Sequence, residues 1–215
     1  MADLSRREML KRMVVAGAVA SLPAPRATVA AAQPAAAEAF ESLTAREGAT
    51  LQAVVARLIP ADERGPGALE AGAATYIDRA LTGPLAASLE AYRGGLAALD
   101  RYAQSARGRA FAALDPGDQD GLLRDLEANA APEFGSGAAG FFNLVLTHTI
   151  QGTFSDPAHG GNVEFIGWRM LGYPGVRTTV TADLQRIDRM PPERQVSAYD
   201  FPAFSAARER RTRGR

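Results

Sequence analysis

The chain of 215 residues is long enough to bury one hydrophobic core without a disulfide or a metal ion to stabilise it. It has no cysteine, which excludes disulfides, thiolate zinc sites, cysteine nucleophiles, iron–sulfur clusters and attached c-type haem. The net charge is zero, but without the basic first 32 and last eight residues the body keeps 14 basic and 21 acidic residues. A nucleic-acid-binding domain usually carries its basic residues on the body, so that class is not indicated.

The N-terminus has the features of an export leader. Arg6 and Arg7 lie in the frame Ser-Arg-Arg-Glu-Met-Leu-Lys, and an apolar run of about ten residues follows, too short to span a bilayer core of roughly 30 Å. Small residues come next. This order predicts a twin-arginine signal peptide over residues 1–32, read by the Tat translocase and cleaved after Ala32 or after Ala37. The alternative is a disordered basic arm before a weak helix.

The Tat route exports proteins that are already folded, often around a cofactor. This sequence contains no dinucleotide-binding glycine motif, no Walker motif and no zinc-protease motif. A signal for folded cargo on a chain with no evident cofactor to load predicts that the cargo is another subunit.

Helices are predicted along the rest of the chain. A linker over 33–43 precedes a capping box at Thr44 to Glu47, which starts the first helix, and Pro60 ends that helix. Asp115 followed by a first-turn proline starts another helix. Apolar residues at helical spacing predict further helices over 69–81, 84–107 and 141–150, a short one over 165–171 and another short one around 183–189.

No run of residues alternates apolar and polar side chains for long enough to form a sheet. The sequence therefore predicts an all-α fold, a single irregular helical bundle over 44–190 with an extended basic tail over 191–215. Tyr199, Phe201 and Phe204 of this tail either pack on the tail's own domain or lie along a partner.

The stretch from 141 to 175 is the part around which we expect the chain to be organised. Its first helix is apolar nearly all round, which predicts burial on most sides. A loop over 152–162 follows, rich in glycine, Asp-Pro and Gly-Gly-Asn, and is typical of a specified turn. The short helix after it holds Trp168, the one tryptophan of the chain, and ends at Gly-Tyr-Pro-Gly.

Several residues of this stretch are candidates for chemistry. His148, Asp156, His159 and Glu164 allow a metal site in principle, and a self-sufficient secreted metal enzyme using the first three is the alternative function. A lone histidine on an apolar helix is more often a hydrogen-bonded core residue. The Gly160 to Asn162 turn suits an anion-binding nest or, more simply, a tight turn. Trp168 and Tyr173 on the apolar side of the short helix are expected to be core or interface anchors.

The segment F-F-N-L-V-x-x-H-T-x-x-G-x-F-S-D-P-x-H-G-G-N-x-x-x-x-G-W-x-x-L-G-Y-P-G over residues 141–175 resembles the gluconate 2-dehydrogenase subunit 3 family. The resemblance also covers the twin-arginine leader and an α-helical middle. One departure is His159, where an aromatic such as Tyr is commoner in the family. The motif residues expected at a partner interface are His148, Gly152, Phe154, Asp156, Pro157, His159, Gly160, Gly161, Asn162, Trp168 and Tyr173.

The resemblance implies a small, non-catalytic subunit of a periplasmic, membrane-associated sugar or sugar-acid dehydrogenase, with no cofactor in this chain. A large subunit of the glucose-methanol-choline type binds FAD and oxidises the substrate, and a multi-haem cytochrome c subunit often passes electrons onward. The small subunit bears the Tat signal and carries the signal-less flavoprotein out with it, as the export argument predicts independently.

Overall fold

The computed structural model describes residues 40–63 and 65–205. Within these ranges the fold is helical, as predicted, and the bridge between Asp62 and Gly65 is the one β-type pairing. The predicted leader with Arg6 and Arg7, and the last ten residues, lie outside the described ranges. The α-helices are α2 (Ala45–Leu58), α3 (Ala73–Leu81), α4 (Leu89–Arg107), α5 (Pro116–Glu127), α6 (Ala138–Phe154) and α7 (Ile166–Met170).

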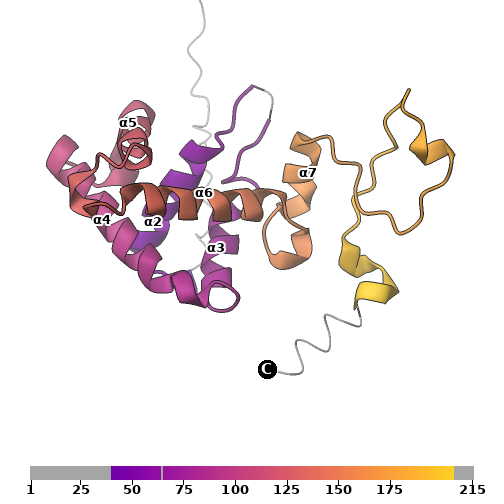
Figure 1. The fold of residues 1–215 in the computed structure, drawn as a ribbon, viewed down its shortest axis with the longest axis horizontal. Coiled ribbons are helices and arrows are strands. Elements are labelled where there is room, and N and C mark those ends of the chain that lie inside the picture. Colours follow the sequence, from indigo (N-terminus) through magenta and orange to yellow (C-terminus); the bar gives the residue numbers. More distant parts are fainter. Residues whose placement is uncertain (1–39, 64, 206–215) are drawn as a thin grey trace, which may run out of the picture. The chain divides into compact units, whose positions relative to one another are not determined.

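Helix α6 is the central element of the bundle. It contacts α2, α3, α4 and α5 on its sides and α7 beyond its C-terminal end. Figure 1 shows α6 passing across these helices, with α7 at its right-hand end and the yellow C-terminal segment further to the right. Helix α6, which contains the first part of the stretch that the sequence singled out, is therefore central, whereas α7 packs on its end.

The hydrophobic core is built by the first part of the domain. Every residue of the buried core cluster lies between Leu43 and Val145. Beyond Val145, Trp168 is the one large hydrophobic side chain that is buried among the described residues. The C-terminal third thus adds little to the core and has to be held by specific polar contacts. The largest fully buried side chains include Tyr92, Phe111, Leu51, Ile77, Leu81, Leu96, Leu99, Leu122 and Leu126.

Two helix starts follow the predicted capping chemistry. At α2 the Thr44 hydroxyl accepts a hydrogen bond from the Glu47 amide, and the Glu47 carboxylate accepts one from the Thr44 amide at 2.8 Å. At α5 the Asp115 carboxylate accepts a hydrogen bond from the Asp118 amide at 3.0 Å. Both caps satisfy backbone donors that have no partner inside the helix.

Two other predicted helices begin later than expected. The prediction of a start at residue 69 is wrong, because Gly72 has a left-handed backbone (φ 77°) and ends a series of turns before α3. Leu69 consequently lies outside the helix and is 40% exposed. The helix predicted from Pro84 begins at Leu89, after a short 3-10 turn at Ala86–Ser88.

Helix α6 is longer than predicted and less buried. It begins at Ala138 and continues through Phe154, so Gly152 lies in a helical turn and not in the following loop. Its apolar composition suggested burial on most sides, but one side faces solvent. Ile150 is 46% exposed on this side. The other residues of the exposed side include Asn143, Thr147 and Gln151.

The C-terminal segment packs on its own domain as far as the structure describes it, through contacts given below. The short helix expected around 183–189 is reduced to a single 3-10 turn at Asp183–Gln185. A second 3-10 turn at Ala198–Asp200 carries its own capping box, from Ser197 to Asp200. Among the described residues no helix combines the length and apolarity that a membrane crossing needs.

Candidate functional site

His148 is a buried partner of Tyr92 and not an open ligand. The Tyr92 hydroxyl and His148 Nδ1 share a hydrogen bond of 3.0 Å, and the two rings stack with centroids 5.8 Å apart. His148 is 6% exposed and Tyr92 fully buried. Burial lowers the pKa of His148, which favours the neutral imidazole. The predicted reading of His148 as a hydrogen-bonded core residue is therefore confirmed.

Three glycines allow the C-terminal end of α6 to be packed on both sides. A Cβ on Gly152 would press against the Ala73 backbone of α3 and the Tyr76 ring. A Cβ on Gly161 would collide with the Gly152 carbonyl, and one on Gly167 with the Thr153 carbonyl. The backbone of the loop and of α7 therefore lies directly against α6. Close approach of backbones is a use of glycine that no other residue can replace.

Asn162 joins the loop to α6 and α7. Its side chain is fully buried, and its Oδ1 accepts hydrogen bonds from the Gly167 amide at 2.8 Å and the Trp168 amide at 3.4 Å. Its Nδ2 donates to the Ser155 carbonyl, and its own amide donates to the Gly152 carbonyl, both at 2.8 Å. The side chain thus caps the start of α7. The Gly160 and Asn162 amides, which a nest would offer to an anion, donate to the Pro157 and Gly152 carbonyls. The Gly160 to Asn162 turn has the structural role.

The backbone between Asn162 and α7 is held in an uncommon conformation. Glu164 (φ 51°) and Phe165 (φ 61°) both adopt the left-handed region, which is rare for residues with bulky side chains. The Arg169 guanidinium donates to the Glu164 carbonyl, and the Asn162 contacts fix the helix that follows. This conformation turns the chain sharply enough for α7 to lie on the end of α6.

Asp156 ties the loop to the C-terminal segment. Its Oδ1 accepts hydrogen bonds from the Ala158 amide at 2.9 Å and from the Ser197 hydroxyl at 2.6 Å. Its Oδ2 accepts one from the Ala198 amide at 2.8 Å. We call this set of bonds to Ser197 and Ala198 the Asp156 latch. Pro157 begins the 3-10 turn that positions the latch, and that turn ends at His159.

His159 lies on the outside of the latch. It is exposed, and its ring meets Tyr199 edge to face with centroids 5.5 Å apart. Within the described part of the chain no three His, Cys, Asp or Glu side chains lie close enough to hold a metal ion. The structure gives His148, Asp156 and His159 separate partners, so it does not bring together the residues of the alternative metal site.

An aromatic group surrounds the end of the motif. The Trp168 indole donates to the Phe154 carbonyl at 2.9 Å, and its ring meets the Tyr173 ring edge to face at 4.9 Å. Trp168 is 7% exposed, whereas Tyr173 is 41% exposed and lies beyond the end of α7, not on its apolar side as predicted. A surface hollow of ≈ 550 Å³ is lined by Phe154, Trp168, Leu171, Gly172, Tyr173 and Pro174.

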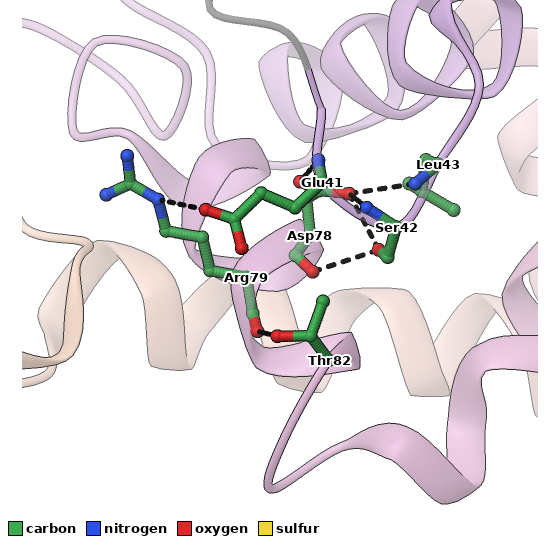
Figure 2. Close-up of polar contacts among 6 residues, drawn as sticks. All are labelled: Glu41, Ser42, Leu43, Asp78, Arg79 and Thr82. Atoms are coloured by element: carbon green, nitrogen blue, oxygen red, sulfur yellow. Dashed lines mark hydrogen bonds and ion pairs between the residues drawn. The ribbon is translucent and has the colours of Figure 1, made fainter. Parts of the chain in front are cut away.

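Sequence reasoning missed a buried carboxylate that anchors the start of the domain. Asp78 of α3 accepts hydrogen bonds from the amides of Glu41 (2.5 Å), Ser42 (3.0 Å) and Leu43 (3.0 Å) and from the Ser42 hydroxyl (2.7 Å), as Figure 2 shows. Arg79, the next residue, pairs with Glu41 at 3.5 Å. The partners lie 35 to 37 residues apart in sequence, so no local pattern signals them.

The sequence motif is therefore a supporting framework whose members mostly bond to one another. Gly152, Asp156, Gly161, Asn162 and Trp168 hold the loop, α7 and the C-terminal segment on the end of α6. What faces solvent around them is a set of large apolar side chains, which is the feature available to a partner. This set comprises Ile150, Val163, Met170, Leu171 and Tyr173.

Comparison with known proteins places the chain in a family. The family model described as gluconate 2-dehydrogenase subunit 3 matches residues 45–175, which is more than half of the sequence and includes the whole motif. No curated protein and no solved structure matches the chain. The chain belongs to the gluconate 2-dehydrogenase subunit 3 family.

Proposed function

We propose that this chain is the non-catalytic small subunit of a periplasmic, membrane-associated sugar or sugar-acid dehydrogenase, and that it serves export, folding and stabilisation of the flavoprotein large subunit. Family membership makes it an accessory component of a dehydrogenase complex. The twin-arginine leader predicted around Arg6 and Arg7 supplies the export part of the proposal. FAD then resides in the large subunit, and a multi-haem cytochrome c subunit accepts electrons in complexes that contain one.

The observation that carries the interaction part is the exposed apolar surface beside the motif. Met170, Leu171 and Tyr173 are 38%, 63% and 41% exposed, and Leu171 and Tyr173 line the hollow described above. Exposed apolar side chains beside a shallow hollow are characteristic of protein-binding sites. In an isolated subunit this surface would meet water, so we expect the free chain to be poorly soluble or marginally stable without its partner.

The first experiment purifies the chain, tagged at its C-terminus, from the periplasm and membrane fraction of its native host. We expect a yellow preparation with flavin absorbance and a larger co-purifying chain. A colourless preparation that contains no larger chain would contradict the proposal.

The export part has its own test. Replacing Arg6 and Arg7 together by Lys should leave both this chain and the flavoprotein in the cytoplasm, because the paired arginines are what the translocase reads. The matched control is Arg26→Lys, which changes a leader arginine outside the pair. Flavoprotein that reaches the periplasm unchanged in the double variant would contradict co-export while leaving the subunit assignment in place.

A further inference from the structure

The segment between α7 and the Asp156 latch forms a long loop with a closed base. The Arg194 amide donates to the Pro174 carbonyl at 2.8 Å, and the Arg177 guanidinium donates to the Pro192 carbonyl. Gly175 (φ 87°) lies so close to the Arg194 carbonyl that a Cβ on it would collide there. Residues 176–193, which we call the closed loop, therefore leave the domain and return to it at one point.

A second brace lies just beyond the base. The Asp156 latch holds Ser197 and Ala198, and the Tyr199 ring packs against His159. The Arg194 guanidinium also lies over the Phe201 ring, 5.8 Å from its centroid. Contacts with motif residues thus fix both ends of the closed loop. A solvated linker is usually flexible and does not need such contacts.

The closed loop has no core of its own. Its one regular element is the 3-10 turn at Asp183–Gln185. Ile187 is fully exposed, Met190 is 73% exposed and Val180 is 55% exposed. A loop of this length without regular structure is uncommon in a compact domain and is usually functional when it is ordered. Apolar side chains held out from a fixed base gain stabilisation only when another surface covers them.

We propose that the closed loop is a docking element whose apolar side chains, Val180, Ile187 and Met190, insert into an apolar groove of the large subunit of the complex, and that the family motif acts indirectly by holding this loop in place. The inference rests on the proposed function, because it takes the large subunit as the partner. It adds a second contact element beside the surface at Leu171 and Tyr173, and it assigns the buried motif residues a supporting role.

The charges of the closed loop favour a protein partner over a membrane. Residues 176–193 contain three arginines and three carboxylates, so their net charge is zero. Arg186 pairs with Asp188 at 2.5 Å, and Arg189 pairs with Asp183. A segment that binds anionic lipid keeps an excess of unpaired Lys or Arg beside its apolar residues. A protein interface has an apolar centre and a polar rim, and the closed loop offers both: exposed apolar side chains, with paired charges around them.

The test co-expresses the tagged chain with its large subunit and compares the wild type with the double variant Ile187→Ser and Met190→Ser. Both side chains are exposed, so the variant should keep the thermal unfolding midpoint of the isolated chain. We expect at least a tenfold loss of recovered large subunit at equal amounts of small subunit. The matched control is Leu69→Ser, which replaces an exposed apolar side chain on the helical body and should leave recovery unchanged.

The outcomes separate the two proposals. Wild-type chain that recovers no larger subunit would overturn the proposed function itself. Equal recovery by the double variant and the wild type would overturn the docking loop alone. Flotation of the isolated wild-type chain with vesicles of phosphatidylcholine and phosphatidylglycerol, lost in the double variant, would assign the loop to a membrane. A concentration-dependent dimer that the double variant abolishes would assign it to a second copy of this chain.

Discussion

The Tyr92 hydroxyl lies 3.0 Å from Nδ1 of His148, and both rings are buried in the middle of the bundle, between α4 and α6. Burial raises the pKa of Tyr92 and lowers that of His148, which favours the neutral form of both groups. A neutral pair satisfies its polar atoms without placing a charge in the core, which fits a structural role at the centre of the family motif.

This pair gives a pH dependence of stability. The pKa of His148 in the folded chain lies below its usual value of 6.5. At pH values between these two pKa values, the unfolded chain therefore binds more protons than the folded chain. His148 should therefore weaken the fold as pH falls below about 6.5, by at most about 1.4 kcal/mol per pH unit. Urea unfolding at pH 7.5 and 5.5 measures this change in the free energy of unfolding.

Carboxylates also titrate in this range, so the comparison needs a variant that removes only the histidine. In His148→Gln the change in unfolding free energy between the two pH values should be smaller than in the wild type. Tyr92→Phe keeps the histidine and serves as the control, because it should retain a His148-dependent decline. Equal pH dependence in His148→Gln and the wild type would contradict the assignment.

Because the Asp78 carboxylate accepts several hydrogen bonds, replacing one of its oxygens should lower the free energy of unfolding substantially. Asp78→Asn keeps the size of the side chain but replaces one carboxylate oxygen with an amide group, which would face the amides of Glu41 to Leu43 as a second donor. Hydrogen bonds to charged groups contribute about 1.5–3 kcal/mol, so the variant should lose roughly that much unfolding free energy. Chemical denaturation measures the loss.

The control for Asp78 is Glu90→Gln. Glu90 pairs with Arg93 at 3.5 Å on the surface and is 86% exposed, so its removal should change stability by less than about 0.5 kcal/mol. Similar losses in the two variants would show that the Asp78 bonds are not what holds the start of the domain.

What could be predicted from the sequence depends on how local the cause is. The Thr44 capping box joins residues three positions apart, and it was predicted correctly. The position of Asp78 depends on amides that lie 35 to 37 residues earlier, and no local pattern indicates it. Likewise the continuation of α6 through Gly152 depends on packing against Ala73 of α3, whereas glycine alone suggested that the helix ends.

The candidate site shows the same division. For the Gly160 to Asn162 turn, residue types favour a tight turn over an anion-binding nest, because positive φ favours Gly and Asn. Its function as the cap of α7 depends on where Gly167 lies in space. The Asp156 latch joins residues more than 40 positions apart, so the sequence left open whether the tail packs on its own domain.

Two glycine substitutions of opposite sign test the close packing at the end of α6. Gly161→Ala should destabilise the fold by about 1–3 kcal/mol, because its Cβ would collide with the Gly152 carbonyl, which the rest of the helix holds in place. Gly94→Ala is the control in the middle of α4, where a Cβ meets nothing within 4 Å. It should stabilise the fold by roughly 0.5–1 kcal/mol. Thermal unfolding of both variants gives the signs, and a neutral Gly161→Ala would contradict the packing described above.

The Asp156 latch predicts how firmly the C-terminal segment is held. Asp156→Ala removes two bonds to the segment, from the Ser197 hydroxyl and the Ala198 amide, and Ser197→Ala removes the first from the other side without disturbing the 3-10 turn at Pro157–His159. Bonds to a charged acceptor contribute about 1.5–3 kcal/mol, so the segment should open at least about tenfold more often. Trypsin should then cut faster after Arg189 and Arg194, and mass spectrometry of the early fragments measures the rates. Glu193→Ala is the control, because within residues 40–63 and 65–205 the Glu193 carboxylate accepts only a weak hydrogen bond, from Gln195 at 3.4 Å. If cleavage is equally fast in the wild type and both latch variants, the segment is held elsewhere, and the bracing that we assign to the motif has to be carried by the loop base at Pro174 and Arg194 alone.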